Sequence, residues 1–89
     1  MATRTKSINI LEIAEKTKRL IRDAKRTEYI LGVAEREIPD RVGEAKRLAE
    51  DLMTTGQFCG FAGIPYDNIE IKHSRAVKAA VADYMIRNG

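Results

Sequence analysis

The sequence predicts a single all-α domain, and three observations lead to that prediction. The chain has 89 residues, a length that suits one domain with a small core. It contains no Trp and only 6% aromatic residues, so that Ala, Leu, Ile and Val must build the core, which favours packed helices. Apolar or small residues recur at alternating steps of four and three between Ile13 and Ile38, as on a helix. We divide the chain into a flexible basic tail, residues 1–6, and one helical domain, residues 7–89.

The first predicted helix is long and runs over residues 7–37. Asn9 followed by Glu12 has the spacing of a capping box, and no Pro precedes position 39. The apolar stripe has heptad spacing and consists of Ile13, Thr17, Leu20, Ala24, Thr27, Leu31, Ala34 and Ile38. Because half of these residues are Ala or Thr, they favour close antiparallel packing over a parallel coiled coil.

The length of this helix bears on self-association. A continuous helix of about 30 residues is roughly 45 Å long, whereas a compact domain of this size is roughly 30 Å across. Either the helix breaks between Thr27 and Gly32, or a second copy of the chain covers the excess. We favour the second alternative, a homo-oligomer that is most simply a symmetric dimer.

The second predicted helix, Asp40 to Met53, packs antiparallel to the first. Pro39 disfavours a helical conformation at Ile38 and is well placed in the first turn of a new helix. The predicted buried face of this second helix consists of Val42, Ala45, Leu48, Ala49 and Leu52. The outer face carries charges at i,i+4 spacing, Lys46 with Glu50 and Arg47 with Asp51.

A third helix is predicted after a glycine-rich and aromatic loop, residues 54–68. Asp67 and Glu70 have capping-box spacing, and apolar residues then recur on one side up to Tyr84. An alternative is a short strand over Ile69–Ile71, with the helix beginning at Ser74.

The sequence argues against several kinds of chemistry. One His and one Cys are too few for a zinc site, and without a C-x-x-C motif dithiol redox chemistry is excluded. The only conceivable nucleophile and base are Cys59 and His73, with Asp67 as a third group, and nothing in their spacing requires contact. We therefore predict a protein that is not an enzyme and has no cofactor or metal. Because no apolar run has the length of a signal peptide or membrane span, we expect a cytoplasmic protein that does not bind a membrane.

Basic residues gather in the first predicted helix. Residues 16–26 hold six basic side chains and one acid, Asp23. The candidate phosphate or nucleic-acid contacts are Lys18, Arg22, Lys25 and Arg26, with Tyr29 placed at the end of the stripe for a base. The competing interpretation is a solvated face whose charges pair as Glu12–Lys16, Glu15–Arg19 and Arg19–Asp23.

The loop over residues 54–68 is unusually apolar. Its bulky side chains are Phe58, Phe61, Ile64 and Tyr66. They either plug the open end of a helical bundle or protrude and anchor a protein partner. The first interpretation is the more frequent one for a small helical domain.

Taken together, these features predict a small non-catalytic helical protein that acts as an interaction or regulatory protein. We expect it to bind another macromolecule, a protein partner, as an oligomer. The alternative is a protein that binds nucleic acid or nucleotide phosphates with the basic face of its first helix. A salt titration separates the two, because only phosphate contacts weaken steeply with salt.

Overall fold

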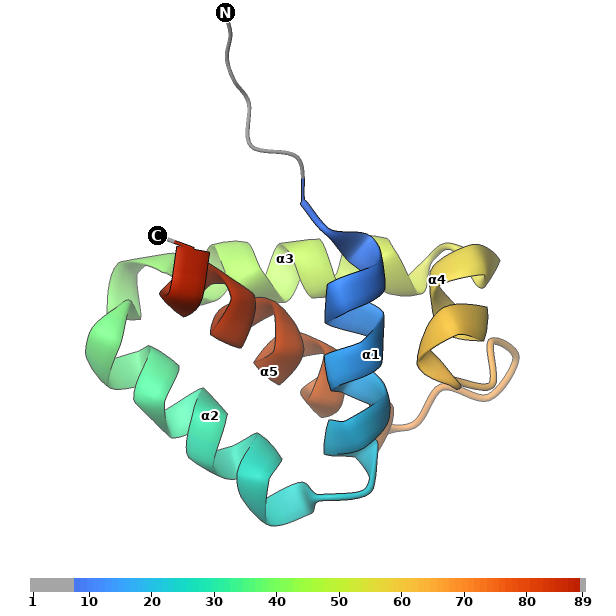
Figure 1. Ribbon diagram of the computed structural model, residues 1–89, viewed down its shortest axis with the longest axis horizontal. Helices are drawn as coiled ribbons and strands as arrows, with labels where there is room; N and C mark the ends of the chain where they lie inside the picture. Colours follow the sequence, from blue (N-terminus) through green and yellow to red (C-terminus); the bar gives the residue numbers. More distant parts are fainter. Residues whose placement is uncertain (1–7, 89) are drawn as a thin grey trace, which may run out of the picture.

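The computed structural model describes residues 8–88, so the predicted basic tail, residues 1–6, lies outside the described residues. Within residues 8–88, five α-helices follow one another (Figure 1). They are α1 (Ile10–Ile21), α2 (Ala24–Glu37), α3 (Val42–Met53), α4 (Gly56–Ala62) and α5 (Ile71–Asn88), with a short 3₁₀ helix, η1 (Pro39–Arg41), before α3. Residues 8–88 contain no strand, so the all-α class is confirmed and the alternative strand over Ile69–Ile71 was wrong.

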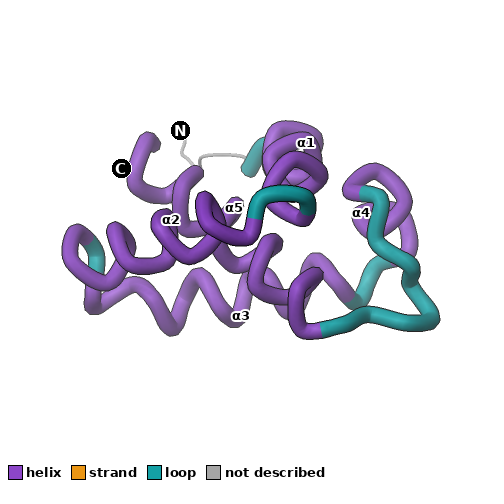
Figure 2. The backbone as a smooth tube through the Cα atoms, turned by 90° about the horizontal axis from the view of Figure 1, so that it is seen from below, coloured by secondary structure: helices purple, strands orange, loops and turns teal. Residues whose placement is uncertain are grey.

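Helix α5 is the centre of the fold. It packs against α1, α2 and α3, while α4 packs against α1 and α3 (Figures 1 and 2). Four alanines of α5, namely Ala76, Ala79, Ala80 and Ala82, are at most 2% exposed. Small side chains on several faces let three helices approach one axis closely, and a helix that is apolar on most of its surface becomes a buried one.

The structure divides the first predicted helix into α1 and α2, and the break lies at Arg22 and Asp23, before the expected region. The carboxylate of Asp23 accepts a hydrogen bond from the backbone N–H of Arg26 at 3.1 Å and so caps α2. The buried hydroxyl of Thr27 donates to the carbonyl oxygen of Leu20 at 2.9 Å, which satisfies the end of α1. An N-cap and a hydroxyl across the corner thus stabilise a turn that contains neither Gly nor Pro.

The break removes the premise for self-association. Helices α1 and α2 have 12 and 14 residues, which corresponds to about 18 and 21 Å. Both fit within a domain of this size, so no overhanging apolar stripe requires a second chain. The three-helix arrangement is accordingly replaced by five helices, of which α1, α2 and α3 pack against α5.

The predicted loop over residues 54–68 contains a helix, α4. The hydroxyl of Thr55 accepts a hydrogen bond from the N–H of Phe58 and caps α4, so that Gly56 begins this helix and does not end α3. Gly63 ends α4 with φ of 74°, a left-handed conformation that favours glycine.

The start of α5 also differs from the prediction. The helix begins at Ile71, and the expected pairing of Asp67 with Glu70 as a capping box does not place its first turn. The N–H of Glu70 instead donates to Nδ1 of His73 at 2.8 Å. His73 is buried, so its ring serves as a local acceptor beside the core.

Candidate nucleic-acid interface

The turn between α1 and α2 brings cations from both helices to two adjoining depressions. The first depression is lined by Lys16, Arg19, Leu20, Asp23 and Arg26 and encloses about 360 Å³. The second is a shallow depression of about 400 Å³ that is open to solvent and lined by Asp23, Lys25, Arg26 and Tyr29. We call the side chains of Lys16, Arg19, Lys25, Arg26 and Tyr29 the basic corner. Asp23 and Arg26 line both depressions, so the two form one continuous surface.

Most charges of the basic corner lack an intramolecular partner. In the described part of the chain, Arg19, Lys25 and Arg26 have no carboxylate within 4 Å. Lys16 has a distant one, Asp83 at 3.9 Å. A surface whose cations are already paired with carboxylates binds phosphate weakly. The guanidinium and ammonium groups of the basic corner remain available for phosphate.

The pairs that would have made this a neutralised face do not form. Glu12 pairs with Arg87 of α5 at 2.9 Å instead of Lys16. Neither Glu15 nor Asp23 lies within 4 Å of a charged nitrogen of Arg19. The three pairs named for the competing interpretation, a solvated and partly paired outer face, are therefore not present within residues 8–88.

Asp23 is the one acid that lines the basic corner, and its position has a structural cause. Its carboxylate caps α2, as described above, and an anion at a helix N-terminus is stabilised by the helix dipole. Asp23 therefore lowers the positive potential of the basic corner, and its role in the structure is to cap α2.

Tyr29 gives the corner an aromatic surface. Its side chain is 61% exposed, the largest exposed fraction among the aromatic side chains of the structure. The guanidinium carbon of Arg26 lies 5.9 Å from the ring centroid, over the ring, which is a cation–π contact. Arg26 and Tyr29 thus present a cation and an aromatic ring side by side at the start of α2.

The structure brings together only part of the predicted phosphate site. Lys25 and Arg26 line the basic corner, whereas Lys18 and Arg22 are exposed outside its two depressions. A Cβ atom built on Gly63 would lie 3.8 Å from Cγ of Lys18, so the stem of Lys18 runs beside the end of α4. The shared face was predicted for a continuous helix, and the break turns the α2 residues away from it.

Sequence reasoning missed Lys16 and Arg19 as members of the site. Lys16, Arg19 and Arg26 follow one another at steps of three and seven residues, which is a helical spacing. This spacing and the excess of basic residues over 16–26 were the available signals.

The four bulky residues predicted as one partner-binding set point in different directions. Phe58 and Ile64 are 2% and 5% exposed and belong to the core. Phe61 and Tyr66 are 43% and 51% exposed. The hydroxyl of Tyr66 donates to the carbonyl oxygen of Thr54 at 3.0 Å, which holds this ring across the connection. Half of the set thus plugs the bundle, and half is available at the surface.

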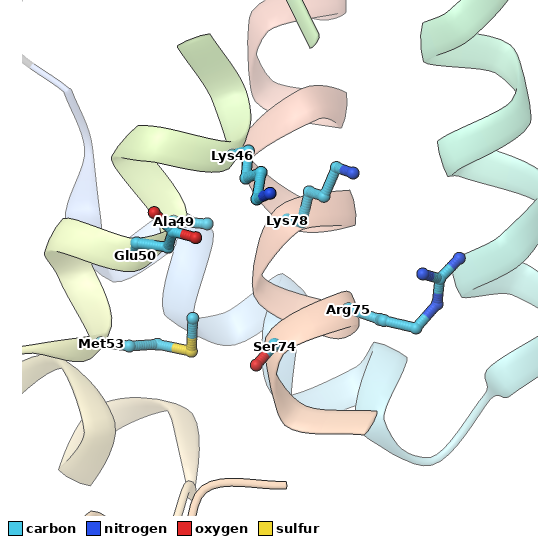
Figure 3. A pocket seen from close by; sticks show the side chains of 7 residues that line it. All are labelled: Lys46, Ala49, Glu50, Met53, Ser74, Arg75 and Lys78. Carbon is cyan, nitrogen blue, oxygen red and sulfur yellow. The ribbon is translucent and has the colours of Figure 1, made fainter. Parts of the chain in front are cut away.

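A second charged depression lies between α3 and α5 and encloses about 270 Å³ (Figure 3). Lys46 and Lys78 stand at one end, and Met53 and Ser74 at the other (Figure 3). Its positive charge is partly neutralised, since Glu50 lines the same groove and Arg75 binds elsewhere.

The partner of Arg75 is Glu28 of α2. The guanidinium donates two hydrogen bonds of 2.6 Å to the two carboxylate oxygens. This bidentate contact holds the pKa of Glu28 below its usual value. The α3–α5 groove consequently has fewer free cations than the basic corner, and no aromatic side chain lines it.

The residues considered for catalysis are not arranged for it. Cys59 is fully buried, and its thiol donates to the carbonyl oxygen of Met53 at 3.6 Å. Burial raises the pKa of the Cys59 thiol, which disfavours the nucleophilic thiolate. Nδ1 of His73 is engaged by the N–H of Glu70, and no hydrogen bond joins His73 to Cys59 within residues 8–88.

The described residues contain no cluster of three or more His, Cys, Asp or Glu side chains that could hold a metal ion. Among the helices of residues 8–88, none is both long and apolar enough to cross a membrane. No family model, curated protein or solved structure matches the chain. The function is therefore inferred from the residues of this chain alone.

Proposed function

We propose that this protein is a non-catalytic binding protein that binds nucleic acid through the basic corner. The observation that carries the proposal is a set of cations without carboxylate partners beside an exposed Tyr29, whose ring makes a cation–π contact with Arg26. Phosphate contacts by Lys and Arg supply most of the affinity of such proteins, and an aromatic ring adds a surface for bases.

The distribution of charge supports this choice of surface. Residues 16–26 carry six basic residues and one acid, a net charge of +5, whereas the whole chain carries +3. The rest of the chain is therefore at −2. A polyanion is therefore attracted to the region between α1 and α2, and the rest of the chain adds little electrostatic attraction.

Two double variants test the proposal. Arg19→Gln with Arg26→Gln removes two charges from the basic corner, and Lys46→Gln with Lys78→Gln removes two from the α3–α5 groove. Both variants carry the same net charge, and none of the four side chains has an ion pair within 4 Å in residues 8–88. The comparison therefore separates a local site from the effect of overall charge.

The expected loss follows from counterion release. Each phosphate contact contributes about 0.7 to 0.9 to the slope of log binding constant against log salt. Losing two contacts lowers that slope by about 1.4 to 1.8 and weakens binding at about 50 mM salt by at least about 60-fold, because the electrostatic term vanishes near 1 M. We expect the groove variant to change affinity by about threefold or less, since screening limits distant charges.

Fluorescence anisotropy with a labelled oligonucleotide provides the measurement, and circular dichroism confirms that both variants are folded. Equal losses in the two variants, or a larger loss in the groove variant, would contradict a site at the basic corner.

A protein partner is the second candidate function, and exposed rings favour it. Phe61 and Tyr66 remain at the surface in and after α4, where aromatic side chains are typical anchors of protein interfaces. A complex of this kind tolerates salt and is lost in Phe61→Ala. The homo-oligomer stays a prediction, although the long continuous helix that suggested it is divided into α1 and α2. Sedimentation equilibrium at micromolar concentration tests it.

A further inference from the structure

We infer that the basic corner takes single-stranded nucleic acid, with one unpaired base stacked on Tyr29. The inference rests on the proposed function and names its substrate class. Its three supports are the accessible ring, the two linked depressions and the concave shape of the surface.

As a stacking surface, the ring of Tyr29 suits an unpaired base. Arg26 lies over one face of the ring, and 61% of the residue remains exposed for a ligand. A base in a duplex is stacked between its neighbours and offers no free face to a side chain. A single strand offers every base, and aromatic stacking is a principal contact in proteins that bind single strands.

The two depressions are arranged for consecutive nucleotides. Both are open to solvent, with volumes of about 360 and 400 Å³. Arg19 and Lys16 line the first, Lys25 and Tyr29 line the second, and Arg26 is common to both. One phosphate contacts Arg19, the next contacts Lys25, and Arg26 contacts the strand between them while its neighbour Tyr29 takes the base.

The shape of the surface argues against duplex recognition. Proteins that read the major groove insert a helix or a two-stranded ribbon into it. At the basic corner the cations come from two helices that meet at a turn, and the space between them is hollow. Both helices also pack against α5 (Figure 1). A flexible single strand can follow such a turn, whereas a straight duplex contacts only the rim of the depression.

The test compares a labelled single-stranded DNA oligonucleotide of mixed sequence with the duplex of the same sequence, by anisotropy over a range of salt. We expect the single strand to bind at least about fivefold more tightly, and Tyr29→Leu to remove that advantage. Tyr29→Phe keeps the ring and retains the affinity. Phe61→Leu, a change of another exposed ring on α4, leaves binding unchanged.

Salt dependence separates stacking from a structural effect. Tyr29→Leu removes no charge, so the slope for the single strand stays as in the wild type while the affinity falls. A changed slope would mean that the substitution displaces the cations, and it would overturn the stacking role of Tyr29.

The remaining outcomes distinguish this inference from the proposed function. Equal affinity for strand and duplex, with Tyr29→Leu neutral, overturns the inference and leaves a nucleic-acid interface in place. A loss of binding in Phe61→Leu places the ring contact on α4 and also overturns it. No binding of either oligonucleotide at about 50 mM salt overturns both, because phosphate contacts are strong at low salt.

Discussion

The opposite positions of Phe58 and Phe61 lead to a sharp prediction for stability. Phe58 is 2% exposed and lies among Cys59 and Ala62, which are also buried, while Phe61 is 43% exposed. Phe58→Ala leaves a cavity where α4 packs against α1 and α3, and such a substitution costs about 3–5 kcal/mol. A chain of 89 residues has a total stability of roughly 4–13 kcal/mol. The variant therefore loses a large part of the free energy of unfolding.

Phe61→Ala is the matched substitution three residues along the same helix. Because Phe61 is half exposed and Ala favours a helix more than Phe does, we expect a change of about 1 kcal/mol or less. Urea unfolding followed by circular dichroism measures both free energies. Similar costs for the two variants, or a larger cost for Phe61→Ala, would refute the assignment of Phe58 to the core and Phe61 to the surface.

Three further predictions concern the corner and the thiol. Asp23→Ala should cost about 1 kcal/mol of unfolding free energy through the lost N-cap of α2, whereas Asp23→Asn keeps a capping oxygen. Both variants remove the acid from the basic corner and should strengthen oligonucleotide binding at low salt. Weaker binding in both variants would count against the site. Thr27→Val keeps the shape of a buried side chain and loses the hydrogen bond to Leu20, so the midpoint of thermal unfolding should fall by about 4–8 °C for a cost of about 1 kcal/mol; an unchanged midpoint would show that this bond does not stabilise the turn. Because burial raises the pKa of Cys59, its alkylation at neutral pH should be slow in the native protein and rapid in urea, and fast native labelling would contradict its burial.

The sequence was most informative where strong local signals mark a helix. Pro39 separates two helices as predicted, and α3 ends at Met53, the predicted residue. The turn at Asp23 was missed although its N-cap is a local signal, because the stripe of heptad spacing continues through it. Thr27, whose hydroxyl bonds to Leu20 across the turn, fits that stripe equally well. Helix α4 was missed because two glycines within seven residues oppose a helix, and its cap at Thr55 and its packing outweigh them.

The candidate site was predictable in composition and not in arrangement. The excess of positive charge over residues 16–26 locates the surface. Which of these cations converge depends on the turn between α1 and α2, so Lys16 and Arg19 joined the site while Lys18 and Arg22 did not. The burial of Phe58 beside the exposure of Phe61 likewise depends on how α4 packs, which loop composition does not determine.

The central claim is that nucleic acid contacts the basic corner, and amide chemical-shift mapping tests it most directly. A short single-stranded oligonucleotide is titrated into the uniformly ¹⁵N-labelled protein at low salt. The account predicts that the largest shifts fall within residues 16–29, with small changes in α3 and α4. Shifts that gather instead around Lys46 and Lys78, or around Phe61 and Tyr66, would contradict it.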